Sequence, residues 1–439
     1  MAPLSTPYTP TTLRATVTPC PWVPFKPHEG HIETPPLPYK PRTDKLLDVY
    51  NISTHVIPAA NPRATPDAPV PEPPPRSSNR DVMKLGHEFT ERQVRQAEGA
   101  WFTNEKLLWN CVNRYTKKGK EANARTKGIT LFLAHATGFP KETWEATLCY
   151  LLTACGSIDE IWSLESVQHG DSALLNRQNL SGSSFDWTDN ARDIANFLIN
   201  YMPEDVETST LPIQLPRLHA SIGESRQKNG FSSRTVVAAG HSFGGCSLVL
   251  AALNFPALFS SMILVDAIID LYQGPAWEFN KFVVGATLVR REQWPSREDA
   301  LRSFKSSPMF STWHPDVLRL YVDHGLYEDA SGCVRLKTSP VHEALIYANP
   351  RASREAWESL ERLEENIELL WVVPGKLRHF VPTAEQAAKE RVWRRPANSS
   401  NILVECGHLI PHECPRELAQ IMADFLHRKY GVILRQSKL

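Results

Sequence analysis

The sequence predicts an α/β fold in which an open, mostly parallel sheet is covered by helices on both faces and carries a helical cap insertion. Short, wholly apolar stretches such as Ile129–Ala134 (ITLFLA) and Ser261–Val265 (SMILV) are typical of parallel strands that are buried on both faces. Helical patterns alternate with these stretches along the chain. Residues 270–345 then interrupt the alternation, and a connection of that length is too long for a simple loop.

Prolines mark the beginning of the chain, because 19 of the 35 prolines lie in residues 1–80. Proline removes a backbone donor and fixes φ, so we expect residues 1–44 to be a disordered leader. Residues 62–80 begin with PRATPDAPVPEPPP and should form an insertion that resembles polyproline II. Between these two stretches, Leu46–Ala59 has the β-branched and aromatic content of a strand.

The core is therefore expected in two parts, 45–269 and 346–433, with the cap at 270–345 between them and an exposed tail at 434–439. Further strands are predicted at Lys106–Tyr115, Glu160–Ser166, Thr235–Ala239, Glu368–Val373 and Asn401–Glu405. Helices are predicted at Thr143–Ala154, Thr188–Met202 and Cys246–Asn254.

The overall composition excludes several classes of protein. Lys+Arg and Asp+Glu are both 48, so the chain lacks the basic excess that is typical of nucleic-acid binders. The eight cysteines form no CxxC pair, which predicts reduced thiols and no metal site. The uncharged stretch 235–265 contains glycines and polar residues, so we interpret it as strand, turn, helix and strand rather than a membrane span. The N-terminus has neither the basic nor the apolar region of a secretory signal.

The strongest motif is Gly240-His241-Ser242-Phe243-Gly244-Gly245, which follows an apolar strand and precedes a helix. In that context a G-x-S-x-G pattern predicts a nucleophile elbow, a sharp turn that exposes the Ser242 hydroxyl at the edge of the sheet. The alternative is an ordinary glycine-rich turn. The backbone N–H of Phe243, at the start of the helix, would then help to stabilise an oxyanion.

A serine nucleophile needs a general base, and His408 is the first candidate. It follows the last predicted strand in the order Glu405-Cys406-Gly407-His408, from which it could reach Ser242. His412, four residues later, is the alternative.

The acid that orients the base is predicted by elimination. In the loop after Glu368–Val373, the position three residues beyond Gly375 is Arg378, which cannot accept a hydrogen bond. Asp266 ends the strand beside the nucleophile strand and is therefore the first candidate. Asp270 and Glu343 are weaker rivals, and a helix-capping role for Asp266 is the alternative interpretation.

A second oxyanion donor should come from the loop that follows ITLFLA. Backbone N–H groups at Ala136, Thr137 or Gly138 are the candidates, although a plain glycine turn is the alternative. The segment 168–172 (QHGDS) resembles a catalytic motif, but we expect it to shape a loop near the site.

The cap contains Trp277, Trp294 and Trp313, which favour an aliphatic or aromatic acyl group over a sugar. Its arginines at positions 290, 291, 297 and 302 could contact the phosphates of coenzyme A, although solvated surface charge is the more frequent role.

The sequence ends in Ser437-Lys438-Leu439, a tripeptide that the peroxisomal import receptor recognises. It predicts that receptor as a partner and the peroxisomal matrix as the location, with a random polar tail as the alternative.

Together these motifs resemble the α/β-hydrolase superfamily over residues 45–433. The ordered landmarks are HATGFPKETWE, SVQHGDSALLN, GHSFGG, Asp266 and VECGHLIPHECP. They are similar to a fungal branch that contains peroxisomal lipase-like hydrolases, host-toxin pathway hydrolases and the acyl-CoA hydrolase of the mycophenolic acid pathway. The resemblance implies Asp266 as the acid and His408 as the base.

The expected activity is hydrolysis of an acyl ester or acyl-CoA thioester by Ser242, His408 and Asp266, on a small-molecule substrate and without a metal or cofactor. A lipase or carboxylesterase that acts on lipid or secondary-metabolite esters is the alternative, and a non-catalytic hydrolase-fold binding protein is the alternative from another class. Epoxide or haloalkane hydrolysis is disfavoured because its elbow nucleophile would be Asp. The sequence leaves a homodimer open.

Overall fold

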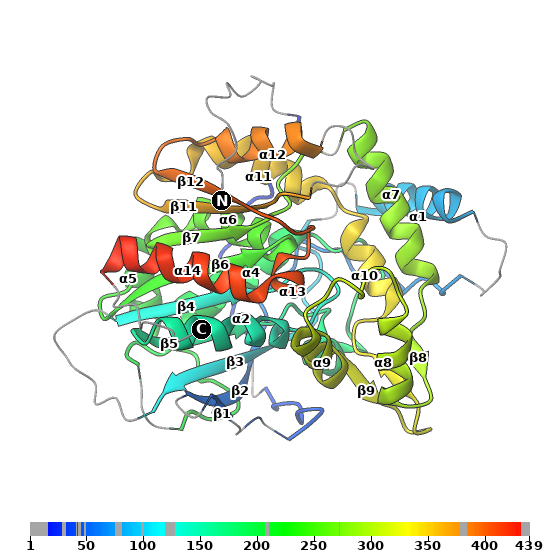
Figure 1. Cartoon of the computed structure of the whole chain (residues 1–439), viewed down its shortest axis with the longest axis horizontal. Helices are drawn as coiled ribbons and strands as arrows, with labels where there is room; N and C mark the ends of the chain where they lie inside the picture. Colours follow the sequence, from blue (N-terminus) through cyan, green and yellow to red (C-terminus); the bar gives the residue numbers. More distant parts are fainter. Residues whose placement is uncertain are drawn as a thin grey trace.

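A nine-stranded sheet forms the centre of the computed structural model (Figure 1), which describes residues 16–28, 32–40, 42, 45–47, 50–74, 81–97, 101–118, 128–206, 210–271, 273–376 and 384–431. Its strand order is β1-β2-β3-β5-β4-β6-β7-β11-β12. The strands are β1 (Lys45–Leu46), β2 (Tyr50–Pro58), β3 (Trp109–Lys117), β4 (Gly128–Ala134), β5 (Ile158–Leu164), β6 (Arg234–His241), β7 (Ser261–Val265), β11 (Glu368–Pro374) and β12 (Ser399–Val404). The six strands from β5 to β12 are parallel, and β1 to β3 pair antiparallel at one edge.

Helices cover both faces of the sheet because each central strand presents apolar side chains in both directions. In β4, Phe132 and Ala134 face one core, whereas Leu131 and Leu133 face the other. The first face carries α4 (Trp187–Asn200), α5 (Ala220–Asn229), α6 (Phe243–Asn254), α11 (Arg351–Ser359) and α12 (Ala384–Trp393). The second carries α2 (Glu145–Ala154) and α14 (Pro415–Tyr430), which lie side by side in Figure 1. The predicted fold class is confirmed.

Shorter elements complete the core. They are α3 (Gly170–Asn176), α13 (Ile410–Glu413) and the 3-10 turns η1 (Lys141–Trp144), η2 (Pro256–Leu258) and η3 (Leu360–Arg362). None of the eight cysteines, all of which lie in the part of the chain that the structure describes, forms a disulfide. Within the described residues, no helix combines the length and apolar character that a bilayer span requires.

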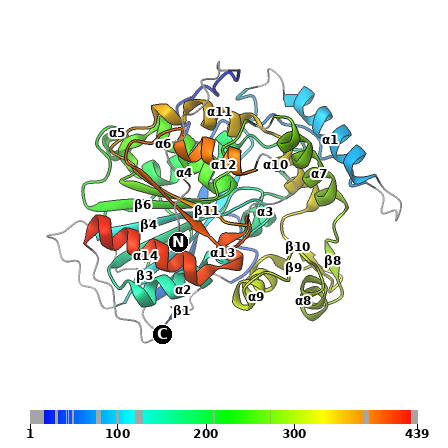
Figure 2. The same ribbon diagram turned by 45° about the horizontal axis from the view of Figure 1, so that its top comes forward.

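The insertion after β7 forms a cap that lies beyond one end of the sheet (Figure 2). It contains α7 (Pro275–Val289), α8 (Arg297–Lys305), α9 (Pro315–His324) and α10 (Pro340–Tyr347). It also contains a small antiparallel sheet, β8 (Gln293–Trp294), β10 (Val334–Leu336) and β9 (Leu326–Glu328). The predicted helices of the cap are present, and the small sheet is an addition that the sequence analysis missed, since strands of two or three residues are too short to show an alternating pattern.

A helix that the sequence did not predict, α1 (Val82–Ala97), packs against α7 of the cap, and both figures place the two helices together. The helices approach closely because Gly86 of α1 faces Gly285 of α7. A Cβ at Gly86 would lie 1.9 Å from the carbonyl oxygen of Lys281, and a Cβ at Gly285 would lie 2.0 Å from that of Val82. Segment 82–97, which follows the proline-rich stretch, therefore belongs to the cap layer.

Part of the proline-rich leader lies on the core, which corrects the expectation of disorder for residues 16–28 and 32–40. The ring centroids of Trp22 and Phe25 lie 5.4 and 6.2 Å from that of Phe255. The guanidinium of Arg192 lies over both leader rings and donates a 2.7 Å hydrogen bond to the carbonyl of Val23. Proline favours an extended chain, but these aromatic and cation–π contacts hold that chain against α4.

The first residues of the 62–80 insertion are also part of the core. The guanidinium of Arg63 lies 2.5 Å from the carboxylate of Asp193, with both side chains buried. The backbone N–H groups of Ala64 and Thr65 donate to the two carboxylate oxygens of Asp189 at 2.7 and 2.8 Å. Charged and polar groups of α4 thus bind this segment, whereas residues 75–80 lie outside the described residues.

Candidate active site

The predicted nucleophile lies in a strained turn between β6 and α6. Ser242 has φ +55° and ψ −117°, a region that side-chain-bearing residues rarely adopt. A Cβ at Gly244 would lie 2.5 Å from the carbonyl oxygens of Ala134 and His135, and a Cβ at Gly240 would lie 2.7 Å from the first turn of α6. Only glycine allows these backbone approaches, which is why the motif requires small residues on both sides of the serine.

The structure brings His408 and Asp266 to this turn. His408 follows β12, and its Nε2 lies 3.0 Å from the Oγ of Ser242. Its Nδ1 lies 2.5 Å from Oδ2 of Asp266. A carboxylate only accepts hydrogen bonds, so Nδ1 carries the proton toward Asp266 and Nε2 is left to accept the hydroxyl proton of Ser242.

The sheet register explains why Asp266 and Ser242 are neighbours. His241 is the last residue of β6, Val265 is the last residue of β7, and the two are register partners in adjacent parallel strands. Ser242 and Asp266, which directly follow these two strand ends, are therefore neighbours at the same edge of the sheet. Two further backbone bonds fix the arrangement, from the N–H of Ser242 to the carbonyl of Val265 at 3.0 Å and from the N–H of Asp266 to the carbonyl of Val372 at 2.8 Å.

A buried arginine that the sequence did not single out binds the other oxygen of Asp266. The Arg391 guanidinium, on α12, donates to Oδ1 of Asp266 while Oδ2 faces His408. Burial by itself would raise the pKa of Asp266, but the charge of Arg391 and the contact with His408 outweigh burial and hold that pKa at about 2. Asp266 is therefore ionised at neutral pH. No local motif surrounds Arg391, which is 125 residues away in sequence.

The alternative candidates lie in other environments. His412 is buried against Phe139 and Trp313, at ring-centroid distances of 4.3 and 4.4 Å, and burial holds its pKa well below the usual value. Glu343 forms an ion pair with Arg290 of the cap. The backbone N–H of Asp270 binds the hydroxyl of Ser353, on α11. The contact to Nδ1 of His408 is made by Asp266, and Arg378 lies outside the described residues.

Two of the predicted oxyanion donors are near the elbow. Phe243 is the first residue of α6, where the backbone N–H has no intrahelical acceptor. Thr137 lies in a turn closed by a 3.4 Å hydrogen bond from the N–H of Phe139 to the carbonyl of Ala136. The prediction for Gly138 needs correction, because its N–H donates to Nε2 of His169 at 2.9 Å and is not free to bind an oxyanion.

The four cap arginines have partners within the protein, so their expected role in phosphate binding lacks support from these contacts. Arg290 binds Glu343 at 2.9 Å, and Arg297 donates to carbonyl groups at the end of α9. Arg291 donates to a carbonyl two residues away, and Arg302 pairs with a carboxylate of its own helix. These interactions stabilise the cap itself.

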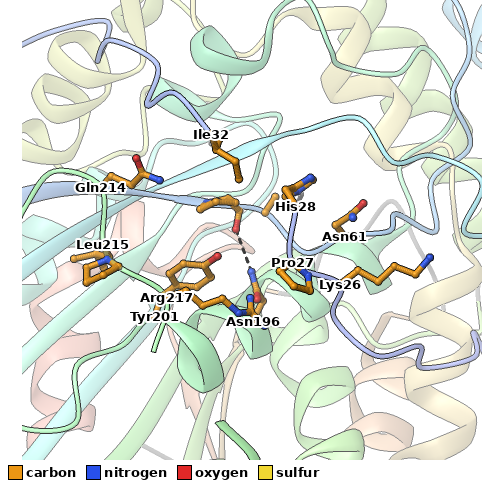
Figure 3. A pocket seen from close by; sticks show the side chains of 13 residues that line it. Lys26, Pro27, His28, Ile32, Asn61, Asn196, Tyr201, Gln214, Leu215 and Arg217 are labelled. Carbon is orange, nitrogen blue, oxygen red and sulfur yellow. Dashed lines mark hydrogen bonds between the residues drawn. The ribbon is translucent and has the colours of Figure 1, made fainter. Parts of the chain in front are cut away.

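A cavity of about 300 Å³ lies away from these residues, between the leader, α4 and segment 214–217 (Figure 3). Figure 3 shows Asn196 of α4 within it, and the amide of Asn196 donates to the carbonyl of Pro58 at 3.1 Å. None of its lining residues belongs to the Ser242, His408 and Asp266 cluster.

Comparisons with known proteins agree with this architecture. The abhydrolase domain-containing protein AFT2-1 of Alternaria alternata is 29% identical over 225 residues, which are 44% of this chain and 83% of that protein. The type I acyl-CoA thioesterase mpaH of Penicillium roqueforti is 30% identical over 227 residues, which are 51% of this chain and 45% of mpaH.

Solved structures show the same fold at low sequence identity. The peroxisomal alpha-beta-hydrolase Lpx1 of Saccharomyces cerevisiae aligns with a TM-score of 0.63 and 17% identity, covering 89% of this chain and 93% of Lpx1. E-2-(acetamidomethylene)succinate hydrolase aligns with a TM-score of 0.50 and 14% identity, covering 72% and 95%. Residues 131–421, more than half of the chain, match the model of the alpha/beta hydrolase family. The resemblance predicted from the motifs is confirmed, and the chain belongs to the α/β-hydrolase family.

Proposed function

We propose that this chain is a serine hydrolase that cleaves an acyl ester or an acyl-CoA thioester, with Ser242 as the nucleophile, His408 as the general base and Asp266 as the acid that orients it. The observation that carries the proposal is a continuous pair of hydrogen bonds. Oγ of Ser242 lies 3.0 Å from Nε2 of His408, and Nδ1 of His408 lies 2.5 Å from Oδ2 of Asp266. A hydroxyl is a weak nucleophile unless a base accepts its proton during the attack, and this arrangement supplies that base.

In the proposed acylation step, Oγ of Ser242 attacks the acyl carbonyl carbon while Nε2 of His408 accepts the hydroxyl proton. The tetrahedral intermediate places negative charge on the former carbonyl oxygen, and the N–H groups of Phe243 and Thr137 stabilise it. The ionised carboxylate of Asp266 stabilises the imidazolium that forms. The leaving alcohol or thiol then takes the proton from His408.

Deacylation repeats these steps with water. His408 accepts a proton from water, the resulting nucleophile attacks the acyl-enzyme, and Ser242 leaves as the restored hydroxyl. The free acid is the product. Each proton therefore passes through Nε2 of His408, which needs no other proton acceptor in the cycle.

The cap supports an apolar acyl group as the substrate. Beside the oxyanion turn, the ring of Phe139 lies 5.3 Å from Trp313 and 5.9 Å from Tyr321, within a buried cluster of cap residues. An apolar, aromatic cap of this kind supports an aliphatic or aromatic chain rather than a sugar. The similarity to mpaH, a protein named as a type I acyl-CoA thioesterase, supports a thioester leaving group.

The experiment that tests the proposal is thiol release from short, medium and long acyl-CoAs beside cleavage of p-nitrophenyl esters. Ser242→Ala should reduce turnover by several orders of magnitude. Ser247→Ala is the matched control, because Ser247 is a buried serine one turn further along α6 whose hydroxyl binds the carbonyl of Phe243. Turnover by Ser242→Ala at the wild-type rate would refute the proposal. Cleavage of the p-nitrophenyl esters without thiol release from the acyl-CoAs would indicate that the protein is a carboxylesterase or lipase.

Labelling by a fluorophosphonate separates an enzyme from a non-catalytic binding protein, because only an activated serine reacts. We expect labelling of the wild type and of Ser247→Ala, and none of Ser242→Ala. An unlabelled wild type without turnover would indicate a binding role.

We infer that the protein acts in the peroxisomal matrix. The tripeptide Ser437-Lys438-Leu439 supports import by the peroxisomal receptor, and it lies outside the described residues. The similarity to Lpx1, named as a peroxisomal hydrolase, agrees with that location. Removing the tripeptide from a fluorescent fusion should change a punctate peroxisomal pattern into a diffuse one, and an unchanged pattern would refute this inference.

A further inference from the structure

The loop between β4 and η1 contains a turn whose central peptide has a defined orientation. The N–H of Phe139 donates to the carbonyl of Ala136, and Gly138, the third residue of this turn, has φ +86°. A positive φ at the third residue is the mark of a type II turn. Types I and II differ chiefly by a half-rotation of the central peptide, which here joins Thr137 to Gly138.

A buried histidine fixes this peptide from the core. The N–H of Gly138 donates to Nε2 of His169 at 2.9 Å, and the side chain of His169 is fully buried at the start of α3. Burial holds the pKa of His169 well below its usual value, and the neighbouring His135 and Arg290 lower it further. The ring is therefore neutral and keeps a lone pair on Nε2 to accept the hydrogen bond.

The same histidine ring contacts the residue that follows the nucleophile. It stacks on the ring of Phe243 with the planes 25° apart and the centroids 6.0 Å apart. On its other side it meets the ring of His135 edge to face, at 4.6 Å. One side chain thus connects the turn that contains Thr137 with the first residue of α6, and these are the two elements that carry the proposed oxyanion donors.

The cap closes the opposite side of Gly138. A Cβ at this position would lie 2.8 to 2.9 Å from the carboxylate of Glu343, which forms an ion pair with Arg290. The glycine is therefore enclosed between His169 of the core and Glu343 of the cap. These contacts leave no room for a side chain at residue 138, and its positive φ also requires glycine, so the turn is confined on both sides.

We propose that His169 is a positioning residue that anchors the turn 136–139 through the N–H of Gly138 while it packs on Phe243, and so holds the N–H of Thr137 in place relative to the start of α6. This inference rests on the proposed serine hydrolase function. Without an acceptor at Nε2, the buried N–H of Gly138 would lose its partner, and displacement of the turn would be the way to relieve that loss. The N–H of Thr137 lies in the preceding peptide of the same turn, so a displaced turn would move this donor away from the developing charge.

The experiment compares His169→Phe, which retains a ring but has no acceptor, with His169→Gln, which retains an acceptor oxygen. His55→Phe is the matched control, since His55 is a buried histidine of β2 that contacts Ser53 and Pro212. We expect His169→Phe to reduce kcat by about 10- to 100-fold with KM changed less than about threefold, as for partial loss of an oxyanion donor. His169→Gln should recover at least half of that loss on a logarithmic scale.

A second measurement uses phenylboronic acid, whose tetrahedral adduct with the serine needs the same N–H donors. Its inhibition constant should rise in His169→Phe by the factor by which kcat falls, and it should stay unchanged in His55→Phe. A third measurement does not depend on activity: in the Ser242→Ala background, deuterium uptake by a peptide containing Gly138 should become at least about tenfold faster with His169→Phe but not with His55→Phe.

The inference is refuted if His169→Phe and His55→Phe have the same kcat and the same inhibition constant, or if the uptake at Gly138 does not change. If His169→Phe does not fold, an unchanged kcat together with an unchanged inhibition constant in His169→Gln supports the inference, and loss of both to the level of a donor deletion refutes it. Absence of Ser242-dependent turnover in the wild type refutes the proposed function instead, and the deuterium measurement then still reports whether His169 holds the turn.

Discussion

Replacing Arg391 by glutamine should destabilise the protein in a way that depends on pH. Arg391 and Asp266 are both buried, with 8% and 6% of their side chains exposed, and the guanidinium binds the carboxylate oxygen that does not face His408. Arg391→Gln removes the positive charge and leaves a neutral amide on a shorter side chain. The buried carboxylate of Asp266 then loses its strongest stabilising charge.

The size of the effect follows from the pKa of Asp266, which is held at about 2, below the ordinary aspartate value of 3.8. A difference of about two units corresponds to roughly 2 kcal/mol of stability at neutral pH. Burial alone would raise this pKa, so removal of Arg391 should move it above the unfolded value rather than only back to it. We therefore expect a loss of about 2–4 kcal/mol in the free energy of unfolding at pH 7.

The sign of the pH dependence is fixed by the depressed pKa. A carboxylate with a lowered folded-state pKa contributes stability above its unfolded pKa of about 3.9, and that contribution disappears as pH falls through the folded pKa of about 2. The difference between wild type and Arg391→Gln should thus be largest near pH 7 and should shrink toward acid, where Asp266 is protonated in both proteins.

Urea unfolding at pH 7, 5 and 3.5 measures this difference. Arg395→Gln is the control, because Arg395 is a similarly buried arginine whose guanidinium donates to the carbonyl groups of Ala397 and Ile367 and touches no carboxylate of the site. Its deficit should be independent of pH over this range. A deficit below about 0.5 kcal/mol at pH 7 for Arg391→Gln, or one as large at pH 3.5 as at pH 7, would refute the reasoning.

Two further predictions concern glycines. Gly244→Ala should lower the free energy of unfolding by about 3 kcal/mol or more, because its Cβ would lie 2.5 Å from two backbone carbonyl oxygens. Gly332→Ala is the control: its φ is +79° and the nearest atom lies 4.0 Å away, so backbone strain alone should cost about 1–2 kcal/mol. Equal losses of stability in thermal unfolding would contradict this. Gly86→Val should separate α1 from α7 and expose α1 to trypsin while the core stays folded. Lys84→Ala, on the exposed side of α1, is the control and should be cleaved like the wild type. If Gly86→Val resists trypsin as well as the wild type does, α1 does not depend on the close contact of Gly86 with α7.

The sequence predicts the central sheet well because its strands are buried on both faces. Ser261–Val265 is continuous apolar sequence followed at once by a charged residue, and the observed strand has these bounds. The same reasoning fails for β9 and β10, which have three residues each and take their partners from the cap rather than from a repeating pattern. It also misses α1, which depends on contact with α7 and follows a proline-rich stretch.

The residues of the candidate site likewise fall into two groups, those that the sequence reveals and those that it does not. Ser242 and His408 are predictable because each follows an apolar strand within a short motif that has a local conformational meaning. Arg391 and the hydrogen bond of His169 are not, since both depend on contacts between elements that only the folded sheet brings together. The leader shows the converse error. Its proline content predicts disorder, and residues 16–28 form no helix or strand, but Trp22 and Phe25 contact an aromatic ring of the core, which composition does not reveal.

The sheet fixes the proposed nucleophile and acid more firmly than the proposed base. Ser242 and Asp266 each continue a parallel strand, and backbone hydrogen bonds to the neighbouring strands hold both. His408 follows the edge strand β12, two strands beyond β7, and its loop needs other support. The ring of His241 supplies it, since Nε2 lies 2.9 Å from the carbonyl oxygen of His408. Burial, with a smaller effect of His408, lowers the pKa of His241 to about 3, so the ring stays neutral and donates this bond. His241, the residue before Ser242, thus connects the loop of His408 to the end of β6. A small residue at position 241 could not make this contact.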